Sequence, residues 1–336
     1  MMRRYGGGRG AGSTGRRKDA VMDSSSESQP TPNPIGSGQS APFEAKMIFV
    51  GPEGIRAGWR LLIYVCTVAV IGVGLFVVLG QIPAFRNALT QASQGSMTTT
   101  ALIFSEIPQA IAVLLAAVLM SLIEKRSWGA YGMPLKQALG LRFWEGMLWG
   151  VAAISAMIGL IAAFHGYSFG AIALSRPEII NKGLLYLFGF FLVGIFEEYS
   201  FRGYTQFTLA TGIGFWPAAG ILSGAFGAVH LGNKGEGLVG AASVVMIAMF
   251  FCLTLRRTGN LWFAIGLHCS FDWGETFLFS VPNSGNLAEG CLSHSTMQGA
   301  RWLTGGSVGP EGSVFCFLVV ALMFLVFHLL HPAKPE

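Results

Sequence analysis

The chain has 336 residues, of which 52% are hydrophobic and 12% charged, and its formal net charge is +5. Together with a mean hydropathy of +0.55, this composition excludes an ordinary soluble globular protein and is typical of a chain that crosses a membrane several times. The densest basic cluster, between Arg3 and Lys18, precedes every apolar segment, which favours contact with anionic lipid headgroups over a nucleic-acid partner.

Residues 1–45 are rich in Gly, Ser and Pro, and this composition predicts a disordered basic tail in the cytoplasm. The tail contains no short apolar core with a cleavage-like site, so we expect the first membrane span to act as the insertion signal. Residues 46–336 are predicted to form one transmembrane domain, with a catalytic core at about 180–280. The five cysteines lack paired spacing, which argues against a disulfide framework or a thiolate zinc site.

The apolar segments predict an all-α membrane protein, a polytopic bundle of about eight transmembrane helices around an intramembrane active-site cavity. Basic residues between the segments are denser on one side, which predicts a multi-pass protein of the cell membrane with both termini in the cytoplasm. The long segment 281–312 is expected to form either a short amphipathic helix or an irregular cap outside the membrane. The predicted spans are 60–82, 101–123, 143–165, 183–209, 213–231, 238–255, 260–280 and 313–331.

Two adjacent carboxylates and an arginine interrupt the apolar span 183–209. Charged groups inside a membrane are costly, and they usually face a protein interior and serve a site. Glu198 and Arg202 are four residues apart on one helix face, so we expect them to pair. Glu197 is turned about 100° away around the helix axis, which leaves it available for chemistry. The alternative is that these charges only hold two helices together.

Two later apolar segments contribute His230, His268 and Asp272, the last two again four residues apart. With a rise of about 1.5 Å per residue, these three side chains and Glu197 lie about 12–24 Å into a hydrocarbon core about 30 Å thick. A single histidine in an apolar helix more often makes an interhelical hydrogen bond, but their similar depth indicates a common site. The other polar residues of these segments lack such partners and are interpreted as packing or interfacial groups, with Glu275 nearest to an outer shell; they are Glu106, Gln109, Glu145, Glu275 and His328.

These residue types permit hydrolysis by either of two routes. Glu197, His230 and His268 form a sufficient ligand set for a catalytic Zn²⁺ ion, which would leave one position for water. Without a metal, Glu197 would act as general base for the water while His230 orients it. His268 and Asp272 would then stabilise the oxyanion, with Asp272 either orienting His268 or, when protonated, donating a hydrogen bond itself. No His-Glu-x-x-His motif favours the metal.

The order of the three motifs resembles one known family. Glu-Glu-x-x-x-Arg at 197–202, Phe-x-x-x-His at 226–230 and His-x-x-x-Asp at 268–272 closely resemble the CPBP family of intramembrane endopeptidases, also called the Abi or CAAX-protease family. The similarity covers about residues 180–280. It implies that Glu197, Glu198, Arg202, His230, His268 and Asp272 are the catalytic residues.

The resemblance implies cleavage of peptide bonds in membrane-associated, lipidated or leader peptides, by an enzyme usually named a metalloprotease although a metal-free glutamate mechanism has also been argued. Its partners would be a peptide or protein substrate presented at the membrane and the lipid bilayer itself. Asp272 stands where the eukaryotic relatives have asparagine. An ionised aspartate lacks the amide donor, which weakens an oxyanion role and favours metal binding or orientation of a histidine.

Three other functions fit parts of the pattern. Gly220-Ile221-Leu222-Ser223-Gly224 with His268 resembles the serine and histidine of a rhomboid-like protease, but the spacing is one residue too long. A proton-coupled transporter would use the buried acidic residues and histidines as a relay, yet the sequence shows no internal repeat. The third alternative is a non-catalytic scaffold or immunity-type protein with the same fold.

Overall fold

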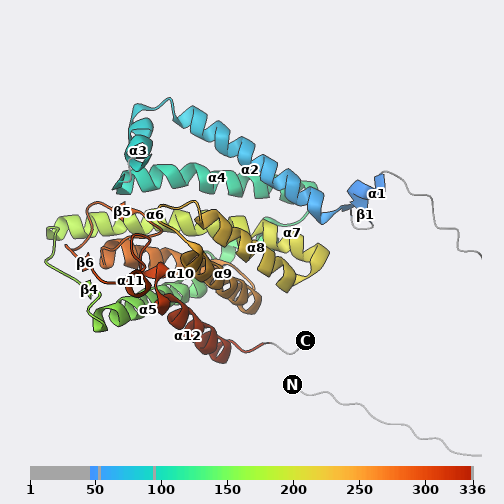
Figure 1. Ribbon diagram of the computed structural model, residues 1–336. Coiled ribbons are helices and arrows are strands. Elements are labelled where there is room, and N and C mark those ends of the chain that lie inside the picture. The colour runs from blue at the N-terminus through green and yellow to red at the C-terminus, as the bar shows by residue number, and fades with distance from the viewer. Residues whose placement is uncertain (1–45, 52–53, 94–95, 334–336) are drawn as a thin grey trace, which may run out of the picture. The chain divides into compact units, whose positions relative to one another are not determined.

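The computed structural model describes residues 46–51, 54–93 and 96–333, which are mostly helical (Figure 1). The predicted disordered tail lies outside these residues. The longer helices are α2 (Ala57–Leu79), α3 (Pro83–Ser93), α4 (Thr99–Glu124), α5 (Leu141–Ala163), α6 (Arg176–Arg202), α7 (Tyr204–Ile213), α8 (Phe215–His230), α9 (Leu238–Thr258), α10 (Trp262–Trp273) and α12 (Val314–Leu330). The short elements are α1 (Lys46–Phe49), α11 (Arg301–Thr304), β1 (Val50–Gly51), β2 (Gly54–Ile55), β3 (Ser96–Met97), β4 (Tyr167–Ser168), β5 (Leu287–Ala288) and β6 (Thr296–Met297).

Each of the eight predicted spans contains a helix, but not every helix is long enough to cross a membrane. Within the described residues, five segments have the necessary length and hydropathy: α2, α4, α5, α6 continued by α7, and α9. The helices α8, α10 and α12 have 16, 12 and 17 residues, fewer than the roughly 20 that a span requires. The polytopic helical architecture is therefore confirmed, whereas a count of eight spans is not.

The α6 helix begins with a capping box and ends beside the predicted catalytic carboxylates. Glu178 accepts hydrogen bonds from the backbone and the hydroxyl of Ser175, which fixes the first turn. At its other end the helix stops at Arg202, and α7 begins after Gly203, whose N–H still bonds to the carbonyl of Glu198. The single helix predicted over 183–209 is thus two helices, and Glu197 lies in the last two turns of the first.

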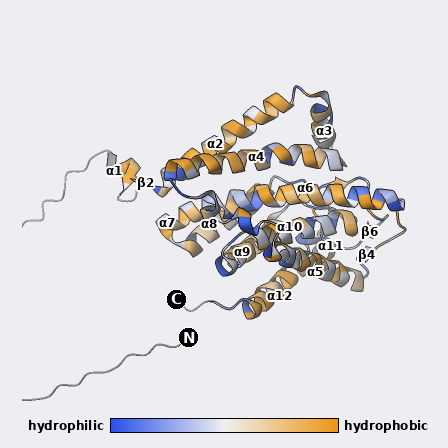
Figure 2. Ribbon diagram, turned by 180° about the vertical axis from the view of Figure 1, so that it is seen from behind, coloured by the Kyte–Doolittle hydropathy of each residue, from blue (hydrophilic) through white to orange (hydrophobic). Residues whose placement is uncertain are grey.

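The α10 helix is the central element of the bundle, because every side chain from Trp262 to Leu267 is buried. It packs against α5, α6 and α9. Two glycines permit its close approach to α5: a Cβ at Gly146 would lie 2.1 Å from the carbonyl oxygen of Phe263, and one at Gly266 would lie 2.2 Å from that of Phe143. Orange, hydrophobic residues predominate along most of the long helices in Figure 2, as expected for a bundle in lipid.

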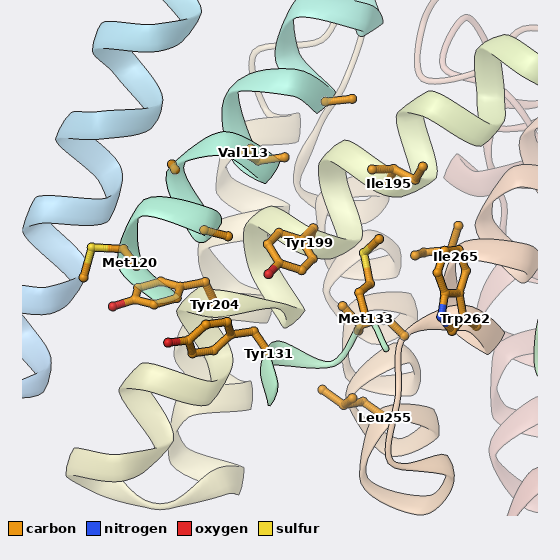
Figure 3. Packing of buried hydrophobic residues seen from close by; sticks show 14 of the residues in the cluster. Val113, Met120, Tyr131, Met133, Ile195, Tyr199, Tyr204, Leu255, Trp262 and Ile265 are labelled. Carbon is orange, nitrogen blue, oxygen red and sulfur yellow. The ribbon is translucent and has the colours of Figure 1, made fainter. Parts of the chain in front are cut away.

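A cluster of tyrosines packs the C-terminal end of α6 and the start of α7 against α2 and α4. Tyr131, Tyr199 and Tyr204 gather between these helices, with Val113 and Met120 of α4 beside them (Figure 3). The hydroxyls of Tyr131 and Tyr204 donate to the carboxylate of Glu124, which also pairs with Arg60 at 2.9 Å. The hydroxyls of Tyr131 and Tyr204 thus have a partner in this core, whereas the buried hydroxyl of Tyr199 has none among the described residues. This packing fixes the C-terminal end of α6, which carries the predicted catalytic residues Glu197, Glu198 and Arg202.

Residues 281–312 form a cover that is bonded to two other loops. The strand β5 pairs in parallel with β3, and β6 pairs antiparallel with β4. An isolated bridge between Ile172 and Ser293 adds a third attachment. The helical elements among these residues are the four-residue α11 and a three-residue 3-10 turn at Pro310–Gly312. Of the two expectations for this segment, the irregular cap is therefore correct. Short strand pairs hold it in place. An amphipathic surface helix is not present among the described residues.

Candidate active site

The site begins with a fully buried ion pair on α6. Arg202 Nη1 lies 3.2 Å from Glu198 Oε1, and neither side chain is exposed. The guanidinium carbon of Arg202 also lies 4.3 Å from the ring centre of Phe226 and 5.4 Å from that of Phe251. Among the described residues, Nε and Nη2 of Arg202 have no hydrogen-bond partner, and the aromatic faces stabilise the cation instead. The contact between Glu198 and Arg202 that their four-residue spacing predicts is therefore present in the structure.

The same carboxylate orients His268 of α10. Nδ1 of His268 lies 2.9 Å from Glu198 Oε1, so Nδ1–H donates to this oxygen and the ring is held by it. The other ring nitrogen, Nε2, points to Glu197 Oε2 at 3.6 Å and to Asp272 Oδ2 at 3.5 Å. The ring also stacks on Phe251, with centres 5.5 Å apart. The hydrogen bond that orients the ring is therefore the one that Nδ1–H donates to Glu198. Asp272 lies beside the other ring nitrogen, Nε2.

His230 ends α8 and is fixed in a comparable way. Its Nδ1 lies 2.8 Å from the carbonyl oxygen of Phe226, one turn earlier in the helix, so Nδ1–H donates to that carbonyl. The two rings are 4.4 Å apart. Donation from Nδ1 leaves Nε2 of the neutral imidazole as an acceptor. Phe226 thus contacts both His230 and Arg202, which connects two of the sequence motifs through one aromatic residue.

Four predicted site residues meet at one cavity of about 310 Å³. Glu197 from α6, His230 from α8, and His268 and Asp272 from α10 all line it. In Glu197 and Asp272, 24% and 13% of the side chain is exposed, which leaves both carboxylates accessible from the cavity but largely withdrawn from solvent. The other lining residues come from β3, α4, α6, α8 and the loop after it, and the cover: Met97, Ala101, Leu102, Ser105, Glu106, Phe190, Val193, Val229, Asn233, Asn283, Ser284 and Asn286.

A narrower apolar cavity of about 60 Å³ adjoins the first. Both are lined by His230, His268, Asp272 and Ser284. Methionine, valine and phenylalanine side chains from α5, α9 and α12 form most of the remaining wall. Glu311 of the cover also reaches it and accepts two hydrogen bonds from Ser284, and burial raises the pKa of this Glu311 carboxyl. The cover therefore contributes polar groups to both cavities.

The predicted metal ligands are suited in chemistry but are not assembled as a coordination group. His230 and His268 each donate from Nδ1, which directs Nε2 toward the cavity as in many metal-binding histidines. Across residues 46–51, 54–93 and 96–333, however, no three His, Cys, Asp or Glu side chains are grouped closely enough to hold an ion. The arrangement of these side chains therefore does not fit a bound metal ion.

The serine of the rhomboid-like alternative lies away from these cavities. Ser223 is fully buried in α8, and its hydroxyl lies 3.8 Å from the sulfur of Cys252. It is not among the described residues that line either cavity with His268. We expect Ser223→Ala to retain at least half of any proteolytic rate measured with purified protein. A loss comparable to that of Glu197→Gln would restore the serine mechanism.

Sequence reasoning missed the part played by Glu106. The sequence predicts a packing or interfacial group at this position, but Glu106 lines the main cavity, and Gln109 Nε2 donates to its carboxylate at 3.0 Å. Its position in an apolar span was the available signal, because intramembrane carboxylates usually serve a site. Glu275, which we placed in an outer shell, is fully buried and is not among the described residues that line the two cavities.

Comparison with known families agrees with this geometry. Residues 179–274 match the family described as type II CAAX prenyl endopeptidase Rce1-like. The matched segment runs from α6 to the start of the π-helical turn at Gly274–Leu278, and it contains all three sequence motifs. No curated protein matches the chain at a significant level.

Proposed function

With residues 179–274 assigned to the CPBP (CAAX protease) family, we propose that the chain hydrolyses peptide bonds at a site inside the membrane, with Glu197 as the residue that activates water. The family supports a CAAX-type intramembrane endopeptidase in general terms. The observation that carries the proposal is the meeting of Glu197, His230, His268 and Asp272 at one cavity between helices. The substrates of the proposed enzyme are peptides presented at the membrane.

Glu197 acts as general base in this scheme. Its carboxylate takes a proton from water while the oxygen adds to the carbonyl carbon of the scissile bond. His230, held by the Phe226 carbonyl, accepts the second water hydrogen at Nε2 and so orients the nucleophile. Both residues line the same cavity, and 24% of the Glu197 side chain is exposed.

His268 stabilises the oxyanion that forms on the attacked carbonyl. Glu198 holds Nδ1–H, so Nε2 of the doubly protonated ring donates into the cavity. Asp272 and Glu197 flank that nitrogen, and their negative charge favours an imidazolium between them. In this scheme Asp272 supports the charge on His268 and does not donate to the substrate.

Hydrolysis can be tested directly with the purified, reconstituted protein and a pool of membrane-anchored peptides. In water enriched in ¹⁸O, we expect cleavage products that carry one ¹⁸O atom in the new carboxyl group. Glu197→Gln protein in the same vesicles provides the blank. An absence of cleavage with every peptide, or transport of a solute that persists in Glu197→Gln, would instead favour the scaffold or the proton-coupled transporter.

Metal removal separates the two routes to hydrolysis. If Glu197 acts on water directly, dialysis against a strong zinc chelator is expected to leave the cleavage rate within about twofold of its starting value. The alternative is a Zn²⁺ ion held by Glu197, His230 and His268, which would lower the pKa of its bound water toward 7. Loss of activity on chelation, restored by one equivalent of zinc, would assign the reaction to that second route.

The location of the enzyme follows from the same proposal. Several apolar helices and the membrane-protease family indicate a multi-pass membrane protein. We propose that both termini face the cytoplasm, in keeping with the basic residues of the sequence. Single cysteine labels placed near Lys18 and near His331, probed with a membrane-impermeant reagent in intact cells, would remain unreacted in this orientation.

A further inference from the structure

The cavity contains a carboxyl group that the scheme above does not use. Glu106 of α4 lines it with Glu197, His268 and Asp272. Its Oε1 accepts a hydrogen bond from Gln109 Nε2 at 3.0 Å, and Ser105 Oγ lies 3.4 Å from the same oxygen. Within the described residues, Oε2 receives no hydrogen bond from a protein group. One oxygen of Glu106 is thus held in place, and the other remains available for the contents of the cavity.

The position of Glu106 is complementary to that of Glu197. The two carboxyl groups come from different helices, α4 and α6, which pack against each other. Both line the same cavity, together with Asp272. Two carboxyl groups that share a cavity with no cation between them are rarely ionised together. His268 lies between Glu197 and Asp272, whereas no cationic side chain among the described residues pairs with Glu106. The arrangement therefore suits one ionised and one protonated group, which is what acid and base catalysis require.

Hydrolysis of an amide bond needs both an ionised group that acts as base and a protonated group that acts as acid. When the C–N bond of the tetrahedral intermediate breaks, the electron pair moves to nitrogen, and an amine leaves only if nitrogen receives a proton. In the proposed function Glu197 has already accepted a proton from water. The remaining charged or titratable groups that line the cavity are His230, His268 and Asp272, and all three have the roles described above.

We propose that Glu106 is a further catalytic residue, the general acid that protonates the leaving amine. The proposal rests on the proposed function. In the full sequence, water gives one proton to Glu197 and its oxygen to the carbonyl carbon. Glu106 then gives its proton to the nitrogen as the C–N bond breaks, which yields a carboxylic acid and an amine. The proton on Glu197 returns to Glu106 through solvent, and the net reaction consumes one water molecule.

A comparison of two leaving groups isolates this role. We expect Glu106→Gln in proteoliposomes to cleave a membrane-anchored peptide about 100-fold or more slowly, through kcat with little change in KM. A thioester of the same sequence should be cleaved within about threefold of the wild-type rate, because a thiolate, with a pKa of about 8.5 for its conjugate acid, leaves without a proton. Glu145→Gln makes the same chemical change outside the cavity and should affect neither substrate.

The other outcomes have distinct meanings. Equal losses on the amide and the thioester, or no loss on the amide, would overturn the role of Glu106 as acid while leaving the protease intact. Wild-type protein that cleaves neither substrate would overturn the proposed function itself. Should Glu106→Gln fail to fold, Gln109→Leu removes the hydrogen bond that holds Glu106, and a smaller loss confined to the amide substrate is expected. An equal loss on both substrates in Gln109→Leu would contradict the proposal.

Discussion

Replacing Glu197 with glutamine is expected to lower peptide cleavage by about 100- to 10,000-fold, the range that a positioned general base contributes. Glutamine has nearly the same shape but cannot accept the proton of water. Within the described part of the chain, the nearest ionic partner of Glu197 is His268 Nε2 at 3.6 Å, and 24% of the Glu197 side chain is exposed. We therefore expect unchanged thermal unfolding in detergent alongside the loss of activity.

The measurement is a progress curve for a membrane-anchored peptide, with wild-type, Glu197→Gln and Glu145→Gln proteins at equal concentration. Glu145 pairs with Arg142 and His331 away from the cavity, so its variant controls for the chemical change alone. A Glu197→Gln rate within tenfold of wild type would remove this residue from the role of base. Asp272 and Glu106, as the other carboxylates on the cavity, would then be the residues to test.

Replacing Arg202 with alanine is expected to destabilise the protein by about 3–5 kcal/mol, the range for breaking a buried ion pair by removal of one partner. Glu198 would retain a buried charge, with His268 as its remaining partner. Arg202 is also packed between Phe226 and Phe251, so its loss leaves a cavity among the aromatic rings. The unpaired charge and the new cavity both lower the stability of the protein.

The destabilisation can be measured by thermal unfolding in detergent, with Arg142→Ala as the matched control. Arg142 also pairs with a glutamate on its own helix, but 41% of its side chain is exposed, so its loss should change stability by less than about 1 kcal/mol. Equal melting temperatures for Arg202→Ala and wild type would contradict the structural assignment. We also expect the double variant Glu198→Gln, Arg202→Met to be more stable than Arg202→Ala, because it contains no unpaired charge.

Local features of the site could be predicted from the sequence because they depend on helix geometry. The four-residue spacing of Glu198 and Arg202 places them in contact, and the same spacing places His268 and Asp272 on one face. The adjacent position of Glu197 directs it elsewhere. The second hydrogen bond of Glu198, to His268, could not be predicted in this way, because it joins residues 70 positions apart on different helices.

The remaining differences between the sequence-based expectations and the structure arise from long-range packing, which a local sequence pattern does not encode. A helix buried in protein and one exposed to lipid are equally apolar, so hydropathy could not distinguish the buried, 12-residue α10 from a full span. Glu106 enters the cavity only because α4 packs on α6. The strand pairs of the cover each involve two residues, too few to produce an alternating pattern.

Phe226 has a consequence for how this site can change over evolutionary time. Its carbonyl holds His230 while its ring covers Arg202; Arg202 in turn neutralises Glu198, which orients His268. Contacts of this kind make the effects of substitutions non-additive. A lineage that lost one of these side chains would be under little selection to keep the others. Descendants of this protein should therefore carry the whole set or discard it together, and partial sets should be short-lived.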